Sequence, residues 1–139
     1  MSMGAGFILY KKDDSGNGIK FLGLISRYKY RISHNGVFDI PKGSIDFGES
    51  ALDCAIRECY EECRVIVDEK NVYEKCRDFS GLTIFISELK SQVPKILPNP
   101  HSGKLEHLGF TWCNPKFLYD NCFDYLKPCI LWAKKELAV

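Results

Sequence analysis

The sequence predicts an α+β fold in which one early helix and one late helix lie around a mixed β-sheet. Short apolar runs bounded by glycine, proline or charged residues are typical of strands, and several occur along the chain. Two longer segments, residues 50–63 and 114–139, instead carry apolar residues at helical spacing. With 139 residues, no internal repeat and no linker, the chain is expected to form a single domain, residues 1–139.

Five apolar segments are predicted to be strands: residues 4–10, 21–28, 37–43, 82–90 and 105–113. The first two should form a hairpin, because the turn signal Asp-Asp-Ser-Gly-Asn-Gly occupies residues 13–18 between them. Residues 29–36 end in Asn-Gly and are predicted to form a loop or hairpin turn. Residues 65–79 are expected to hold a short strand and a connection, and residues 91–104, with three prolines, a long loop.

The two predicted helices differ in how clearly they begin and end. Ser50 followed by Asp53 resembles a capping box, with aspartate in place of the usual glutamate, so the first helix should begin there. The final segment, residues 114–139, is predicted to be one helix with a kink or break at Pro128.

Composition argues against several classes of protein. The formal net charge of +1 provides no global attraction to nucleic acid or to an anionic membrane. The N-terminus lacks the pattern of a signal peptide, and no apolar stretch is long enough to span a membrane, so a cytoplasmic protein without a membrane partner is expected. The seven cysteines lie mostly in apolar segments and form no C-x-x-C pair, which favours reduced thiols that serve as small core residues over disulfides or a zinc site.

Three glutamates lie close together on the first predicted helix. Glu58, Glu61 and Glu62 form a stripe ~100° wide, and like charges at this spacing repel. The stripe is either a solvated helix face or a set of oxygen ligands for a divalent cation such as Mg²⁺. The wider pattern favours the cation, because the sequence fits G-x5-E-x7-R-E-U-x-E-E-x-G-U, where U is apolar, at Gly43, Glu49, Arg57, Glu58, Glu61 and Glu62.

This 23-residue motif is the signature of the Nudix hydrolases, and the chain resembles that family. The resemblance implies a Nudix-type α/β/α sandwich with a mixed β-sheet, the loop–helix Nudix box and a C-terminal helix. One position departs from the motif, since Arg64 stands where the family has a glycine that usually ends a helix in the left-handed conformation. Arginine in that conformation costs ~1 kcal/mol, or else the helix ends differently. Arg64→Gly is therefore expected to keep activity and to keep or raise stability.

The resemblance also implies the chemistry and the role of each residue. Nudix enzymes hydrolyse a pyrophosphate linkage in a nucleoside diphosphate derivative by attack of water on phosphorus, with Mg²⁺ or Mn²⁺ as cofactor. Metal ligands would be the main-chain carbonyl near Gly43 with Glu58, Glu61 and Glu62. Catalytic roles would fall to Glu49 and Glu61, which assist the metal or the water, and to Arg57, which orients the glutamates. Glu106 is the candidate general base outside the motif, the alternative being an exposed carboxylate at the start of a strand.

The segment around Lys42 is similar to that of two subgroups, the dinucleoside tetraphosphate hydrolases and the diphosphoinositol polyphosphate phosphohydrolases. Both usually have histidine where this chain has Ser44. Lys42 would then contact phosphate. A basic and aromatic segment could bind a polyphosphate or an RNA 5′ end, or could be a solvated hairpin; it comprises Arg27, Tyr28, Lys29 and Tyr30.

A dinucleoside polyphosphate or a related polyphosphate is thus the expected substrate. The alternatives are removal of an RNA 5′ cap or 5′ polyphosphate, hydrolysis of oxidised nucleoside triphosphates, and hydrolysis of ADP-ribose or sugar nucleotides. A non-catalytic nucleotide-binding Nudix module is the alternative of a different class, and the complete set of motif glutamates argues against it. The sequence carries no signal for an oligomeric state.

Overall fold

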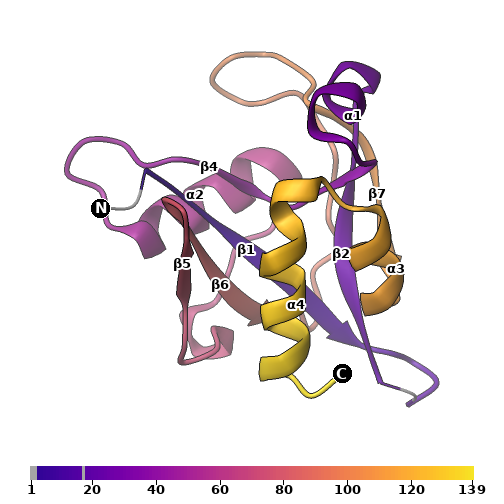
Figure 1. Ribbon diagram of the computed structural model, residues 1–139. Coiled ribbons are helices and arrows are strands. Elements are labelled where there is room, and N and C mark those ends of the chain that lie inside the picture. The colour runs from indigo at the N-terminus through magenta and orange to yellow at the C-terminus, as the bar shows by residue number, and fades with distance from the viewer. Residues whose placement is uncertain (1–2, 17) are drawn as a thin grey trace.

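A mixed β-sheet forms the centre of the computed structural model, which describes residues 3–16 and 18–139 (Figure 1). Within these residues the strands are β1 (Gly4–Lys12), β2 (Ile19–Ser26), β3 (Phe38–Asp39), β4 (Lys42–Ser44), β5 (Arg77–Phe79), β6 (Leu82–Glu88) and β7 (His107–Cys113). They are arranged in the order β3-β2-β1-β6-β5, with β4 paired to β1 and β7 paired to β2. β1 runs antiparallel to β2 and parallel to β6, so the predicted mixed sheet and leading hairpin are confirmed.

Helices cover both faces of this sheet. They are α1 (Tyr28–His34), α2 (Ala51–Cys63), α3 (Pro115–Asn121) and α4 (Lys127–Glu136), with short 3-10 turns η1 (Glu69–Asn71) and η2 (Asp124–Leu126). Side chains alternate along β1, so Phe7 packs in the core beneath α2 while Ile8 packs in the core beneath α3 and α4. A strand buried on both faces reads as a continuous apolar run, which explains the sequence GAGFILY. The predicted α/β/α sandwich is confirmed.

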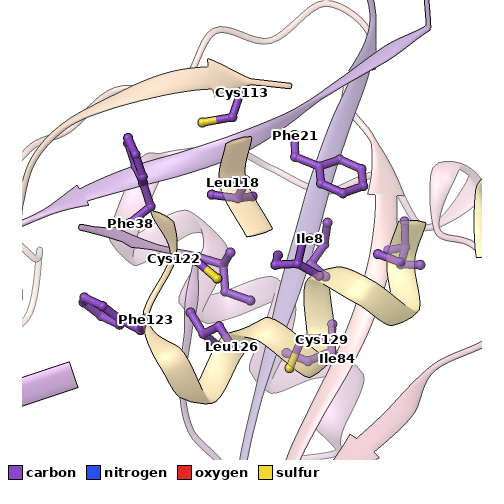
Figure 2. Close-up of a cluster of buried hydrophobic side chains, with 14 residues drawn as sticks. Ile8, Phe21, Phe38, Ile84, Cys113, Leu118, Cys122, Phe123, Leu126 and Cys129 are labelled. Carbon is purple, nitrogen blue, oxygen red and sulfur yellow. The ribbon is translucent and has the colours of Figure 1, made fainter. Parts of the chain in front are cut away.

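The core beneath α3 and α4 contains cysteines among large apolar side chains. Figure 2 shows Cys113, Cys122 and Cys129 packed with Leu118 and Leu126, all of them buried. Six of the seven cysteines are buried, Cys76 is exposed, and all seven are free thiols. The six buried cysteines therefore act as small core residues, as predicted for most of the seven.

The prediction of a loop or hairpin turn over residues 29–36 was wrong. The chain leaves β2 at Ser26 rather than at Tyr28 and forms α1, which ends at Asn35 in the left-handed conformation with φ 51°. Asn-Gly suits both a hairpin turn and the end of a helix, because both need a residue with positive φ. The turn signal at 13–18 is closed by a hydrogen bond from Asp13 N–H to Gly18 O; Asn17, which belongs to that signal, lies outside the described residues.

The C-terminal segment contains two helices where one was predicted. Asn114 caps α3 by accepting a hydrogen bond from Lys116 N–H, and the chain then passes through η2 before α4 begins. Pro128 lies in the first turn of α4, where a residue without an N–H causes no loss of a hydrogen bond, so it starts a helix rather than kinking one.

Two strand predictions also differ from the structure. The predicted strand 37–43 is interrupted at Ile40 and Pro41 and forms the two short strands β3 and β4. Val65–Asp68 forms no strand, and β5 is the only strand of the described residues between α2 and β6. No helix among the described residues is both long and apolar enough to cross a membrane.

Candidate functional site

The motif glutamates lie on helix α2, which packs against strands β1 and β4 of the sheet. Ser50 Oγ accepts a hydrogen bond from Asp53 N–H at 3.0 Å, which caps the helix at the predicted residue. The apolar face of α2 packs on β1, and this packing buries two of the three glutamates. Glu61 is 6% exposed and Glu62 is 7% exposed, although glutamates are rarely buried without a partner.

Strand β4 brings its backbone close to these glutamates. Its register places Gly43 opposite Ala5 of β1. The carboxylate of Glu58 lies directly over the α-carbon of Gly43, so that a β-carbon there would overlap with it. Main-chain N–H of Lys42 donates to Glu62 Oε1 at 3.1 Å. The structure therefore brings the Lys42–Gly43 backbone and the motif carboxylates together, as the resemblance implied.

Arg57 connects the helix to the loop that precedes it. Its guanidinium binds Glu49 in a bidentate manner, with Nε at 2.9 Å and Nη2 at 3.0 Å. Nη1 lies 3.0 Å from Glu58 Oε1 and 2.9 Å from Glu61 Oε2, and Nη2 also donates to Ser44 O at 2.9 Å. The hydrogen bonds from Arg57 hold the pKa of Glu49 below its ordinary value. One guanidinium thus fixes three carboxylates in a single arrangement.

The charges of Glu58 and Glu62 are not fully compensated. Burial, followed by the charge of Glu61, raises the pKa of Glu58. Burial also raises the pKa of Glu62 well above its ordinary value, and Lys42 offsets this only in part. Carboxylates that share a buried site without enough positive charge fit a hard divalent cation, which prefers carboxylate and carbonyl oxygens.

A second group of charged and polar residues lies beside the glutamates and joins Lys42 to two residues that the sequence analysis missed, Asp39 and His107. Asp39 Oδ1 lies 2.9 Å from Lys42 Nζ, and Asp39 Oδ2 lies 3.0 Å from His107 Nε2. Burial pushes the pKa of Asp39 upward, but Lys42 and His107 outweigh it and hold the pKa below its ordinary value. Ligand atoms of Asp39, Glu62 and His107 lie within 4.8 Å of one another. A charged residue inside the apolar run VFDIP was the one sequence signal for this group.

A cavity of about 230 Å³ opens on this charged group. Its lining combines the polar residues Asp39, Lys42, Glu62, Glu106 and His107 with the rings of Tyr30, His34, Phe123 and Tyr125. His34 stacks on Tyr30 with ring centroids 6.4 Å apart and meets Tyr125 edge-on at 5.4 Å. We call this the aromatic cavity.

The lining of the aromatic cavity includes some of the predicted substrate-binding residues and not others. Lys42 and Tyr30 line it, whereas Arg27, Tyr28 and Lys29 do not. Tyr28 is 72% exposed, and Lys29 Nζ lies over the ring of Tyr30 at 4.9 Å. The helical form of this segment explains the division, because neighbouring residues of a helix point in different directions.

A larger and more apolar cavity, of about 710 Å³, shares Lys42 and Tyr125 with the aromatic cavity. Its remaining lining comprises Met3, Gly4, Gly43, Ser44, Phe79, Ser80, Gly81, Leu82 and Pro128. We call this the apolar cavity. Gly43 lines it, so the apolar cavity also reaches the motif.

Glu106 approaches the motif from outside it. It directly precedes β7, lines the aromatic cavity together with Glu62, and its charge contributes to the raised pKa of both Glu58 and Glu62.

Two alternatives were open for Arg64, a left-handed backbone at the usual glycine position or a different end of the helix, and the structure has the first. Arg64 has φ 59° and ψ 21°, and its N–H donates to Tyr60 O at 2.9 Å. The arginine therefore occupies the left-handed conformation in which glycine is usual.

Comparisons with known proteins agree with this fold and with the family that the motif indicated. The sequence model of the NUDIX domain matches residues 3–122. The chain therefore belongs to the Nudix family, and it is a Nudix pyrophosphohydrolase, the class of enzyme that the motif predicted. It is similar to a Bis(5'-nucleosyl)-tetraphosphatase (asymmetrical) of Caenorhabditis elegans, with 31% identity over 117 residues that cover 78% of this chain and 76% of the relative.

Two solved structures share the fold at lower identity. A binary complex of a C. elegans Ap4A hydrolase superimposes with a TM-score of 0.70 at 21% identity, over 97% of this chain and 98% of the other. The NUDIX domain of Shewanella oneidensis NrtR, in complex with ADP ribose, superimposes with a TM-score of 0.69 at 15% identity, over 99% and 88% of the two chains.

Proposed function

We propose that this enzyme hydrolyses dinucleoside polyphosphates, with a divalent cation held by the motif glutamates. One observation carries the proposal: a buried, incompletely compensated carboxylate cluster lies next to two cavities that share Lys42 and Tyr125 as a common wall. The relative that is 31% identical acts on a bis(5'-nucleosyl) tetraphosphate according to its name, which supports the same class of substrate.

Glu58, Glu61, Glu62 and the carbonyl of Gly43 would hold Mg²⁺ or Mn²⁺. When bound, such a cation offsets the charge of a polyphosphate and lowers the pKa of coordinated water. Arg57 keeps the carboxylates at fixed positions through its contacts with Glu49, Glu58 and Glu61. Asp39 is not counted among the proposed metal ligands, because the ammonium of Lys42 already lies at its carboxylate.

Lys42 is the residue best placed to meet a phosphate in the aromatic cavity. Burial lowers its pKa, but Asp39 and Glu62 outweigh this effect and raise it, so the side chain stays charged. Asp39 holds the ammonium beside the cavity, and Glu106 lies at the same cavity as a carboxylate that can accept a proton from the attacking water.

The two cavities suit a substrate with two nucleosides joined by phosphates. The aromatic cavity offers Tyr30, His34 and Tyr125 as surfaces on which a base can stack, and the apolar cavity offers Phe79 and Leu82. A chain of phosphates that connects the two would pass Lys42 and Gly43, directly beside the glutamates. Among the described residues that line the two cavities, Lys42 is the one lysine or arginine, so removal of an RNA 5′ cap is the less favoured alternative.

Hydrolysis measured with a panel of substrates tests this function. The panel contains a dinucleoside tetraphosphate, a mononucleoside tetraphosphate, a nucleoside triphosphate, ADP-ribose, a diphosphoinositol polyphosphate and a capped RNA, each with Mg²⁺ and with Mn²⁺. We expect the dinucleoside tetraphosphate to give the highest kcat/KM and Glu62→Gln to reduce it by about 10³-fold or more. Glu69→Gln, an exposed glutamate on η1, is the matched control and should retain full activity.

Variants of the two cavities test how the substrate lies. Tyr30→Ala should raise KM for both tetraphosphates if the aromatic cavity holds the nucleoside they have in common. Phe79→Ala should raise KM for the dinucleoside substrate alone, by about tenfold. Equal effects of Phe79→Ala on both substrates would contradict the two-cavity arrangement, and preferential turnover of capped RNA would replace the proposed substrate.

A further inference from the structure

The loop between β6 and β7, residues 89–106, crosses the C-terminal end of α2 before it delivers Glu106 to the site. Figure 1 shows it as the orange loop beside α1. Its first half is fixed to the residues at and after the end of α2: the side-chain amide of Gln92 exchanges two hydrogen bonds with the backbone of Ile66, at 2.6 and 2.7 Å, and Lys95 N–H donates to Cys63 O at 2.9 Å. Both are remote from Glu106 along the loop.

The second half of the loop is held by the side chain of Arg64. Nη1 donates to Glu61 O at 2.8 Å and to Tyr60 O at 3.2 Å, which satisfies carbonyls that the end of a helix leaves free. Nη2 of the same guanidinium donates to Pro98 O at 2.6 Å. The left-handed backbone at this position would suit glycine better, but glycine has no side chain that could join the helix to the loop.

A second arginine, Arg27, contacts the other end of this half of the loop. Arg27, the residue before α1, donates from Nη1 to Leu105 O at 3.3 Å. Between the two attachment points, residues 99–104 form their own turn, in which Asn99 N–H donates to Lys104 O and Gly103 N–H donates to Asn99 O, each at 2.8 Å. His101 at its tip lies 3.6 Å from Glu61. Residues 98–105 thus form a compact unit held at Pro98 and at Leu105, and Glu106 is the next residue.

We propose that Arg64 is a positioning residue that, together with Arg27, fixes the 98–105 unit and thereby places Glu106 beside the motif glutamates. The inference rests on the proposed function in one respect, the participation of Glu106 in hydrolysis. It replaces the expectation that Arg64→Gly keeps activity, because the variant would gain a favourable backbone and lose the link to Pro98.

Hydrogen exchange of the metal-free protein tests the link without reference to turnover. Arg64→Gly and Arg64→Asn both suit a left-handed backbone but lack the guanidinium, so amides of residues 99–105 should exchange about tenfold faster in both variants. Arg64→Lys keeps a cation that can reach one carbonyl and should give an intermediate rate. Gln92→Ala, which loosens the first half of the loop, is the matched control and should leave residues 99–105 unchanged. Unchanged exchange in Arg64→Gly would overturn the link.

Kinetics of the same variants test the positioning of Glu106. Arg64→Gly should lower kcat about tenfold while KM changes little, since a small displacement of a catalytic group is costly; Gln92→Ala should stay within about twofold. When Glu106 is already replaced by Gln, Arg64→Gly should cause no further loss, because both changes act through one group. Losses that multiply in the double variant would overturn the positioning role, as would full activity of Glu106→Gln. If no substrate is hydrolysed by the wild type, the proposed function fails, while the exchange experiment still decides the link.

Discussion

Glu62 is buried beside other acidic groups, and its side chain accepts a hydrogen bond from Lys42 N–H. A glutamate in this position favours the neutral form and therefore opposes folding at neutral pH until a cation compensates it. If the motif holds a cation as proposed, Glu62 lowers the stability of the metal-free protein in return for cation binding, a balance that is common at functional sites.

Glu62→Gln should consequently stabilise the metal-free protein while it abolishes turnover. The folded-state pKa of Glu62 is raised above its unfolded value, so the group destabilises the fold; this penalty is fully present above the folded pKa and is lost as the pH falls to the unfolded pKa. Glutamine keeps an oxygen that can accept from Lys42 N–H. Thermal unfolding in EDTA at pH 7 should show Tm higher by about 2 to 4 °C, a difference that shrinks as the pH is lowered. A lower Tm in the variant would mean that the charge of Glu62 is compensated within the fold.

The sequence predicted the residues of the motif better than their neighbours. Glu49, Arg57 and the three helix glutamates follow one another at fixed intervals, so a linear pattern was sufficient to find them. Asp39 and His107 are 68 positions apart and become partners only because β3 and β7 both pair with β2. A partnership made by strand pairing has no linear spacing by which it could be predicted.

At the scale of elements, the site depends on how closely β4 approaches β1. Gly6 of β1 faces the backbone at Pro41 and Lys42, and a β-carbon there would overlap with both residues. The absence of a side chain at Gly6 therefore allows β4 to lie where its Gly43 meets the carboxylate of Glu58. Two glycines on paired strands, Gly6 and Gly43, thus allow β4, which carries the first residue of the motif, to lie against α2, which carries the motif glutamates.

Gly6→Ala should displace β4 and reduce both stability and activity. The extra methyl group should cost about 1 to 3 kcal/mol in the free energy of unfolding, and kcat should fall because Gly43 moves away from the glutamates. Gly109→Ala on β7 is the matched control, since its β-carbon would meet only Ile25 Cδ1 at an ordinary 3.7 Å. Urea unfolding and steady-state kinetics of both variants provide the measurement, and normal activity in a destabilised Gly6→Ala would separate the position of β4 from catalysis.

Element predictions succeeded where one structure suited the local pattern and failed where two did. The α2 helix has a cap at Ser50 and an apolar stripe that begins directly after it, and the two signals agree. Residues 29–36 had only Asn-Gly as a signal, and the same dipeptide ends α1. The predicted single C-terminal helix failed because Phe123 turns out of α3 to place its backbone N–H on Phe38 O, a tertiary contact that local periodicity does not reveal.

At the scale of the whole molecule, the sheet separates two cores that meet the site from opposite sides. The core beneath α2 supports the glutamates, and the core beneath α3 and α4 supports Phe123, Leu126 and the neighbouring aromatic wall. A cation held by α2 and β4 would join elements from distant parts of the sequence. Its binding should therefore stabilise the folded chain as a unit, because the unfolded chain cannot assemble the same ligands.

This linkage gives a prediction for the intact protein that requires no substrate. Added Mg²⁺ or Mn²⁺ should raise the free energy of unfolding by about 2.7 kcal/mol at a concentration of 100 times Kd. This corresponds to a rise in Tm of roughly 5 to 10 °C. Glu58→Gln and Glu62→Gln should lose most of this shift, whereas Glu69→Gln should keep it. Ionic strength is matched with a monovalent salt, because general screening also affects a cluster of like charges. If the three variants respond equally, the cation binds outside the motif, and if none responds, including the wild type, the carboxylate cluster is not a cation site.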